Sequence, residues 1–221
     1  MLKGFIFLLG FIFIVGLTSC VTTTIEKDRQ AASVFLEPGS TIIVLGRRHN
    51  SEYETEPDFI ECVAEHLNDG KGDMNVISEK NFVDLLYPWF EPRTAPLHVD
   101  GLHKLMRNEM VAETLTHLKP KYIIWVDGST KTVEKMGSIS CGIAIGAPVS
   151  CFGFGVWTDD SSYETSIWDF SGRFRMGRIS TTARGQSYMP AVMIPIPLIA
   201  PVKSSACRGL ADHLRVFIRP D

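Results

Sequence analysis

The sequence contains no block of basic residues. Its only adjacent pair of lysine or arginine residues is Arg47-Arg48, and the formal net charge of the 221 residues is −3. A protein that binds nucleic acid carries a basic patch or stripe that matches the phosphate backbone. We therefore expect no nucleic-acid partner.

The common motifs of nucleophilic catalysis and nucleotide binding are missing as well. No Gly-x-Ser-x-Gly elbow is present, because "GSISCG" (137–142) has its second glycine one place too late. No strand-to-helix phosphate loop follows the glycines of "GFGVW" (153–157). Paired acids can act as acid and base when burial separates their pKa values, but Asp159, Asp160 and Glu164 lie near an expected hairpin tip. We interpret them as solvated and assign no catalytic residue.

The histidines show no convincing metal-binding pattern. His98 and His103 flank Asp100, but a zinc site needs three or four converging ligands. His103 and His117 share an expected helix and would lie about 21 Å apart along its axis. We interpret these histidines as loop and surface residues, and we expect neither a metal nor a cofactor.

The apolar run at the start of the chain is too short for a comfortable membrane span. It covers "GFIFLLGFIFIVGL" (4–17), which as a helix would be about 21 Å long, against about 30 Å for a hydrocarbon core. Lys3 precedes the run, and the small residues Thr18 and Ser19 follow it. This layout predicts a secretory signal peptide over residues 1–19.

The residues after this run add a more specific signal. Leu17-Thr18-Ser19-Cys20 resembles the lipobox of bacterial lipoproteins, which implies that Cys20 receives a diacylglyceryl group and becomes the first residue. Two or three acyl chains, palmitate among them, would anchor the protein durably in membrane lipid. Val21 stands where lipoproteins retained at the inner membrane commonly have Asp, so the resemblance implies the periplasmic face of the outer membrane. An uncleaved anchor, or a signal peptide with a chance cysteine, is the alternative.

Four further cysteines suggest disulfide bonds, because an exported protein meets an oxidising compartment. Cys141 and Cys151 flank "GIAIGAPVS", a loop whose ends can meet, so we expect them to pair. Cys62 would then pair with Cys207. Cys62 also points away from the apolar face of an expected helix over residues 58–67, which suits a covalent partner from elsewhere.

The remaining pattern predicts an α/β (α+β) fold with a mixed β-sheet of about five strands packed by helices. Residues 20–39 are polar and irregular and read as a flexible tether, and residues 40–221 form one periplasmic domain. Strands are expected over residues 40–46, 74–78, 122–128, 161–170 and 173–182, with a turn at Ser171-Gly172. Helices are expected at 58–67, 79–86, 101–118 and 204–218. The order is β-α-β-α-α-β-β-β-α.

This order, with a strand ending near "VDG" (126–128) and an Asp-containing hairpin before a terminal helix, resembles a known group. It is similar to periplasmic lipoproteins that share the fold of the amino-terminal domain of the Tol-system translocation protein, a group that includes the curli-secretion lipoprotein. The resemblance covers about residues 40–218 and rests on element order. It implies partner binding or assembly in the envelope and no catalysis.

Two long apolar segments, 142–157 and 188–201, are unusual for connections. They could complete the core, form an exposed patch for a partner, or, by resemblance to the curli-secretion lipoprotein, insert in the outer membrane as hairpins of a ring. Four prolines exclude a helix or a central strand over 188–201. The candidate interface residues are Phe152, Phe154, Trp157, Met189, Met193, Ile194, Ile196 and Leu198.

Together these observations predict a lipid-anchored envelope protein that acts without catalysis. We expect it to contact membrane lipid through Cys20 and to bind an envelope protein or a second copy of itself. One alternative is an envelope hydrolase with a site near His98, Asp100 and His103. Another is a subunit of an outer-membrane secretion assembly.

Overall fold

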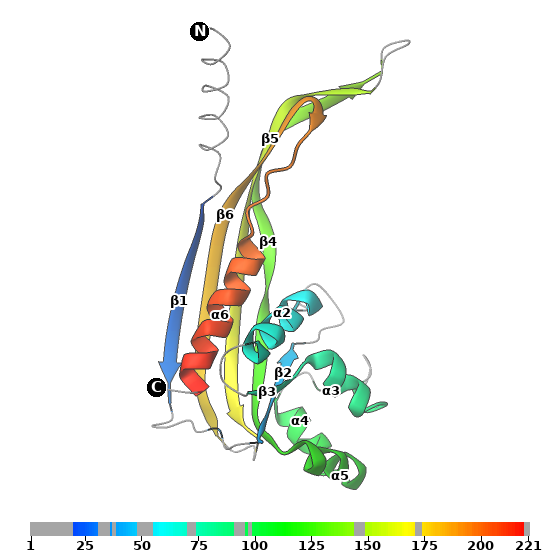
Figure 1. The fold of residues 1–221 in the computed structure, drawn as a ribbon, viewed down its shortest axis with the longest axis vertical. Coiled ribbons are helices and arrows are strands. Elements are labelled where there is room, and N and C mark those ends of the chain that lie inside the picture. Colours follow the sequence, from blue (N-terminus) through cyan, green and yellow to red (C-terminus); the bar gives the residue numbers. More distant parts are fainter. Residues whose placement is uncertain are drawn as a thin grey trace. The chain divides into compact units, whose positions relative to one another are not determined.

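The fold was analysed in a computed structural model (Figure 1). It describes residues 20–30, 36, 39–47, 55–69, 74–90, 96, 99–143, 149–170 and 174–218, without the side chains of 99 and 100. The elements are β1 (Val21–Arg29), β2 (Thr41–Gly46), α2 (Pro57–Asn68), β3 (Asn75–Ile77), α3 (Glu79–Leu85), α4 (Val99–Leu105), α5 (Glu109–Leu118), β4 (Pro120–Gly142), β5 (Ser150–Asp169), β6 (Arg175–Pro195) and α6 (Val202–Ile218).

The strands form a six-stranded mixed sheet in the order β1-β6-β5-β4-β2-β3. β2 runs parallel to both β3 and β4, as expected for strands joined through helices. β5 and β6 form a hairpin, closed by the amide of Asp169 donating to the carbonyl oxygen of Phe174 at 3.2 Å. The predicted mixed α/β class is confirmed, whereas the predicted turn at Ser171-Gly172 lies outside the described residues.

The chain divides into two compact units, which share the long strands. Unit 1 comprises residues 1–22, 132–159 and 184–201, and unit 2 comprises residues 23–131, 160–183 and 202–221. Each of β4, β5 and β6 contributes one part to each unit. Unit 2 contains every helix that the structure describes.

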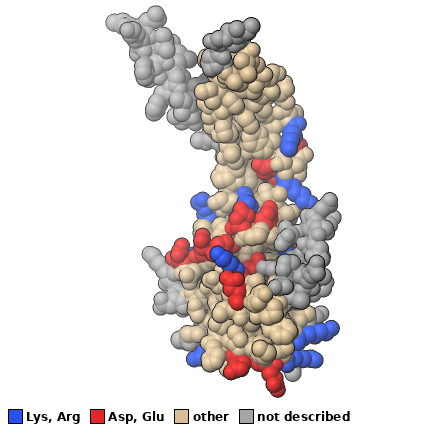
Figure 2. Space-filling view, turned by 90° about the vertical axis from the view of Figure 1, so that its right-hand side faces the viewer, with Lys and Arg blue, Asp and Glu red and all other residues tan. Residues whose placement is uncertain are grey.

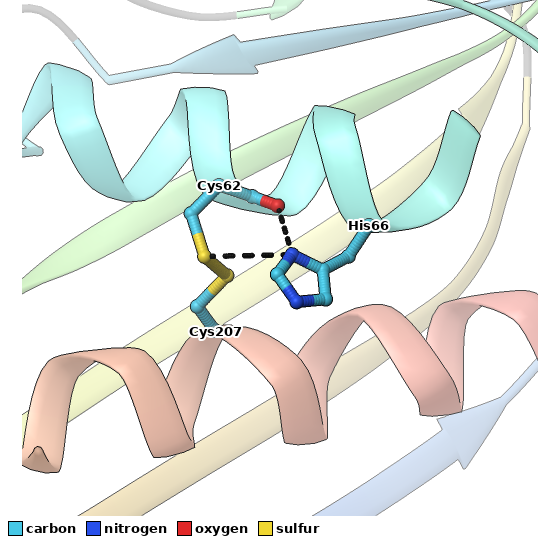
Figure 3. Close-up of side chains that lie close together, drawn as sticks. All are labelled: Cys62, His66 and Cys207. Atoms are coloured by element: carbon cyan, nitrogen blue, oxygen red, sulfur yellow. Dashed lines mark hydrogen bonds between the residues drawn. A yellow bond between two sulfur atoms is a disulfide. The ribbon is translucent and has the colours of Figure 1, made fainter. Parts of the chain in front are cut away.

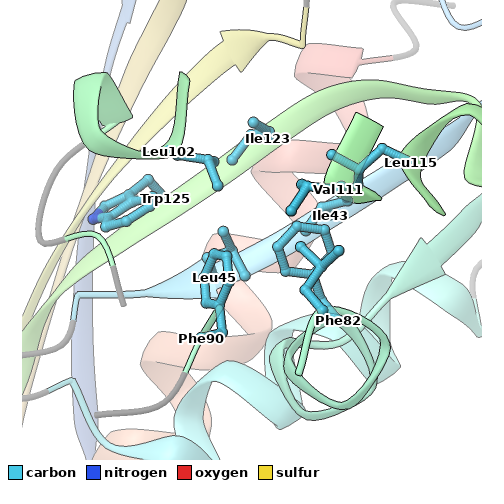
Figure 4. Packing of buried hydrophobic residues seen from close by; sticks show 10 residues of the cluster. Ile43, Leu45, Phe82, Phe90, Leu102, Val111, Leu115, Ile123 and Trp125 are labelled. Carbon is cyan, nitrogen blue, oxygen red and sulfur yellow. The ribbon is translucent and has the colours of Figure 1, made fainter. Parts of the chain in front are cut away.

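The core of unit 2 is built on strands that helices cover on both faces. On one face of β2 and β4, alternate residues such as Ile43, Leu45 and Ile123 pack with Phe82 of α3 and Leu115 of α5 (Figure 4). On the other face, a Cβ added to Gly46 would contact Ile60 of α2. Because both faces are covered, β2 is apolar and buried along its length, as the sequence of a central parallel strand requires.

Helix α2 confirms the apolar face expected between residues 58 and 67. Phe59, Ile60, Val63, Ala64 and Leu67 are its buried residues. Cys62 lies off that face and is bonded to α6.

The single helix expected over residues 101–118 is wrong. The structure has two helices there, α4 and α5, separated at Met106–Asn108. Asn108 caps α5, because its side-chain oxygen accepts a hydrogen bond from the amide of Met110 at 3.0 Å. A good capping residue thus begins a new helix inside a continuous helical pattern.

Residues 21–29 form β1 instead of a flexible tether. β1 lies beside β6 at one edge of the sheet, and the amide of Gln30 donates to the carbonyl oxygen of Met176 at 3.1 Å. Arg29 extends over the ring of Phe217 in α6 at 4.3 Å and donates to its carbonyl oxygen. The polar pattern of β1 hid this strand, because an edge strand buries few of its side chains.

The segments 142–157 and 188–201, expected as connections, lie largely within β5 and β6. β6 carries Pro190 and Pro195 in its last part, beyond the point where β1 begins beside it. Proline is tolerated at position 190 because the short returning segment uses only its carbonyl oxygen, which accepts a hydrogen bond from the amide of Ile196 at 3.0 Å. After β6 the chain turns back, and Tyr188 and Leu198 exchange two backbone hydrogen bonds of 2.9 and 2.7 Å.

Candidate functional site: the apolar surface of unit 1

Unit 1 exposes most of the large apolar side chains that are accessible in the described part of the molecule. On β4 and β5 and beside them these are Val133, Met136, Ile143, Val149, Phe152 and Phe154, and on β6 and the returning segment they are Val192, Met193, Ile194, Ile196 and Ile199. We call this set the apolar surface of unit 1. Exposed apolar residues gathered in this way usually mark an interaction site.

The same part of the chain carries almost no charge. No Asp, Glu, Lys or Arg occurs between Lys135 and Asp159, or between Arg184 and Lys203. Figure 2 shows a broad area free of acidic and basic side chains. Because this surface has no charged side chains, its hydration contributes little to its stability in water.

The predicted interface residues all lie in unit 1. Phe152 and Phe154 on β5 are 58% and 48% exposed. Met193, Ile194 and Ile196 are exposed as well, while Trp157, Met189 and Leu198 are half-buried. The structure therefore does not support the interpretation that segments 142–157 and 188–201 complete the core, because most of their large apolar side chains that the structure describes are exposed.

Two glycines allow β4 and β5 to approach each other closely in unit 1. Gly137 and Gly153 have positive φ angles of 90° and 144°. A Cβ at Gly153 would lie 2.2 Å from the carbonyl oxygen of Ser138, and one at Gly137 would lie 2.0 Å from that of Phe154. These distances are far below van der Waals contact, so both positions require glycine.

Charged residues form a band across unit 1 at the end where its strands continue into unit 2. In the described part of unit 1 they are Glu134, Lys135, Asp159 and Arg184. Arg184 pairs with Glu134 at 3.2 Å, and Asp159 accepts hydrogen bonds from Thr132 at 2.6 Å and Trp157 at 3.1 Å. The band is electrically balanced, with two acids and two bases.

A shallow apolar cavity adjoins this band. Its volume is about 350 Å³, and its lining residues are Thr132, Lys135, Met136, Gly155, Val156, Trp157 and Met189. Trp157 lines the cavity while its indole nitrogen donates to Asp159. Trp157 therefore contacts the apolar cavity on one side and, through its polar nitrogen, a charged residue of the band.

Cys20 lies at the start of β1, is exposed and forms no disulfide. The other residues of the predicted lipobox, Leu17, Thr18 and Ser19, lie outside the described residues, as does the predicted signal peptide. No helix among the residues with a described placement is long and apolar enough to cross a membrane.

Two disulfides link the remaining cysteines in the pairs that the sequence favours. Cys141–Cys151 joins β4 to β5 within unit 1, and Cys62–Cys207 joins α2 to α6 within unit 2. The loop between Cys141 and Cys151 favoured the first pair, and the second followed as the pair of the two cysteines that remained.

His66 lies beside the Cys62–Cys207 disulfide (Figure 3). Its Nδ1 atom is 2.9 Å from the carbonyl oxygen of Cys62 and 3.8 Å from Cys62 Sγ. Ligand atoms of the three residues lie within 4.8 Å of one another, an arrangement that could hold a soft metal ion if both cysteines were thiolates. In the bonded form neither sulfur is a thiolate, so the cluster has a structural role. The spacing of four residues between Cys62 and His66 was the signal that sequence reasoning missed.

The proposed hydrolase residues cannot be assembled from the described part of the chain. His98 and the side chain of Asp100 lie outside it. His103 belongs to α4, and its Nε2 atom is buried with no hydrogen-bond partner in the described part of the chain. Nothing described here brings an acid or a nucleophile to that nitrogen.

A buried polar cluster in unit 2 has an evident structural role. The Tyr163 hydroxyl donates to Glu56 at 2.9 Å, and the amide of Thr130 donates to the other carboxylate oxygen at 2.9 Å. Burial, followed by the nearby negative charge of Glu56, raises the pKa of Tyr163 well above its ordinary value, although a hydrogen bond from Thr130 opposes the shift. The phenol therefore stays protonated and acts as a donor.

Comparisons with known proteins found little similarity. No protein-family model matches the chain, and no curated protein matches it either. Among solved structures, the PelC dodecamer from Paraburkholderia phytofirmans matches with 12% identity and a TM-score of 0.41, over 90% of this chain and 99% of that one. A point variant of the same dodecamer matches with 11% identity and a TM-score of 0.38, over 91% of this chain and 100% of that one.

Proposed function

We propose that this protein is a lipid-anchored component of the bacterial envelope that acts without catalysis, by docking the apolar surface of unit 1 on another envelope component. The observation that carries this proposal is the exposure of Phe152, Phe154 and their neighbours in a part of the chain without charge. Apolar exposure of this kind favours binding. The buried polar cluster at Tyr163 joins α2 to β4 and β5 through hydrogen bonds to Glu56, which is a structural role.

Export and anchoring are part of the same proposal. The pattern Leu17-Thr18-Ser19-Cys20 supports cleavage before Cys20 and attachment of acyl chains to its thiol. The exposed, unbonded state of Cys20 is compatible with such a modification. Both disulfides suit an oxidising compartment, and Val21 supports the periplasmic face of the outer membrane.

The anchor is tested by mass spectrometry of the amino-terminal peptide and by fractionation of washed membranes. We expect the natural protein to begin at an acylated Cys20 and to remain with the outer membrane. The Cys20→Ser variant should carry no lipid and should be lost from the membranes on washing. An unmodified Cys20 thiol in a protein that still begins at Met1 would contradict the proposal.

Docking is tested separately, in intact envelope membranes. The doubly substituted variant Phe152→Ser, Phe154→Ser should keep its lipid at Cys20 but should be released from washed membranes more readily than the natural protein. The control is Phe174→Ser, which removes a phenylalanine from unit 2 that is 71% exposed, more than either Phe152 or Phe154. Equal behaviour of the two variants would contradict a docking role for the apolar surface.

A further inference from the structure

We propose that the component contacted by the apolar surface of unit 1 is the lipid bilayer itself, so that the protein has a second membrane contact besides its acyl chains. This inference rests on the proposed function for the position of the anchor at Cys20. It identifies the component that the apolar surface contacts, and three observations favour the bilayer over a protein.

The first observation is the level of Cys20 along the strands. β1 and β6 run in opposite directions, because Gln30 bonds to Met176 while a Cβ on Gly177 would meet the carbonyl oxygen of Asp28. If the two strands keep this pairing, ten residues from the Gln30–Met176 bond along each strand bring Cys20 level with Gln186. On this count the anchor would lie two residues beyond Arg184, where the charge of β6 ends. Acyl chains attached there would bring the bilayer to the boundary of the apolar surface.

The second observation is the composition on either side of this boundary. Beyond the band, the two segments 136–158 and 185–202 contain no charged residue. A protein partner usually offers polar groups around an apolar centre, and its binding site then has a polar rim around it. Here the charged residues of unit 1 lie along one border instead of surrounding the surface. A lipid bilayer, whose apolar interior is bordered by polar headgroups, fits this pattern better than a protein partner does.

The third observation is Trp157. Its ring lines the apolar cavity with Met136 and Met189, while its Nε1 atom donates to Asp159 in the band at 3.1 Å. Tryptophan is enriched at membrane interfaces because its ring is apolar and its nitrogen is polar. Trp157 thus lies at the level that the headgroups would occupy.

Backbone hydrogen bonding limits the depth of the contact. In unit 1, β4 has β5 on one side and, among the described residues, no strand on the other, since β2 pairs only with residues 120–126 of β4. Unpaired backbone groups are not tolerated in the hydrocarbon core. The apolar surface therefore rests in the headgroup and upper acyl region, as interfacial segments do, and does not span the membrane.

The test uses the mature chain from residue 20 with Cys20→Ser, so that neither the signal peptide nor acyl chains contribute. We expect this protein to float with vesicles of zwitterionic phosphatidylcholine. Because the band is electrically balanced, 0.5 M salt should leave flotation unchanged. The Phe152→Ser, Phe154→Ser substitutions should lower the ratio of bound to free protein at least about tenfold. Phe174→Ser should leave this ratio unchanged.

A second measurement reads the depth of Trp157 in the natural lipidated protein. Phosphatidylcholine brominated on its upper acyl carbons should quench part of the tryptophan fluorescence in reconstituted vesicles. In the Trp157→Phe variant the brominated lipid should no longer quench any fluorescence. In the control variant Trp89→Phe, altered in unit 2, the quenching should persist.

Three outcomes would overturn the inference. They are absence of flotation, flotation that salt abolishes, and quenching that survives Trp157→Phe. Self-association of the Cys20→Ser protein that Phe152→Ser, Phe154→Ser abolishes, without flotation, would assign the surface to a second copy of the chain. Each of these results leaves the mass of the Cys20 peptide unaffected, so failure of this inference is distinct from failure of the anchor.

Discussion

Glu56 shows how a single side chain connects distant parts of unit 2. It precedes α2, and its carboxylate accepts hydrogen bonds from Thr130 on β4 and Tyr163 on β5. The ring of Tyr163 also stacks on Phe59 of α2, with ring centres 3.5 Å apart. One carboxylate therefore accepts hydrogen bonds from both a backbone amide and a buried hydroxyl.

We predict that Glu56→Ala lowers the free energy of unfolding by about 2 kcal/mol, because it leaves two donors without their acceptor. Glu56→Gln should have a smaller effect, since its remaining carbonyl oxygen can still accept one of the two bonds. Urea unfolding followed by circular dichroism measures both changes. Unfolding midpoints equal to that of the natural protein would show that water replaces the carboxylate without cost.

For single residues, contacts between neighbours along a helix can be expected from the sequence, whereas contacts between distant segments cannot. Cys62 and His66 are four residues apart on a helix, and this spacing is visible in the sequence. The role of Glu56 was not visible, because its partners are 74 and 107 residues away. Contacts over such distances depend on the arrangement of strands and helices, which no local pattern contains.

At the scale of elements, the hairpin of β4 and β5 in unit 1 depends on glycine. Gly153 combines a positive φ angle with a neighbouring carbonyl oxygen, whereas a Cβ added to Gly142 would have no atom of the described residues within 4 Å. The two positions belong to the same hairpin and differ in the space around them. They form a matched pair for substitution.

We predict that Gly153→Ala loosens this hairpin, because a Cβ would overlap the carbonyl oxygen of Ser138. Hydrogen exchange of amides in residues 132–143 and 149–159 should speed up at least about tenfold, which corresponds to a loss of about 1.4 kcal/mol in local stability. Gly142→Ala should leave exchange unchanged. Equal exchange in both variants would refute the requirement for glycine at 153.

Sequence patterns predicted the elements of unit 2 better than those of unit 1. The buried strand β2 and the amphipathic helices α2 and α6 have the periodicity that a two-sided core imposes. The outer parts of β5 and β6 lack such periodicity, because their apolar side chains are not divided between a core and water. Glycine and proline in these parts then suggested connections, although both are acceptable where a strand lies at an edge.

At the scale of the whole molecule, the two disulfides constrain very different lengths of chain. Cys62–Cys207 joins residues 145 positions apart, whereas Cys141–Cys151 joins residues ten positions apart. In the chain-entropy model, the cost of closing a loop in the unfolded chain rises with the logarithm of its length. The long-range bond should therefore contribute more to stability.

We predict that Cys62→Ser with Cys207→Ser lowers the free energy of unfolding by about 5 kcal/mol, and that Cys141→Ser with Cys151→Ser lowers it by about 3 kcal/mol. The second pair should affect exchange mainly in unit 1, where its bond lies. Guanidinium unfolding under oxidising conditions compares the variants with the natural protein. A larger loss from the Cys141 and Cys151 substitutions would contradict the ranking by loop length.

The sequence by itself determined the mixed α/β class and the core face of α2, and it suggested the two cysteine pairs and a lipid anchor at Cys20. These features depend on periodicity, spacing and short motifs, which are local. Only the tertiary structure decided that residues 21–29 are a strand, that Glu56 joins α2 to β4 and β5, and that segments 142–157 and 188–201 are exposed. An apolar segment has the same composition in a core and on a surface, so its exposure depends on whether other elements cover it.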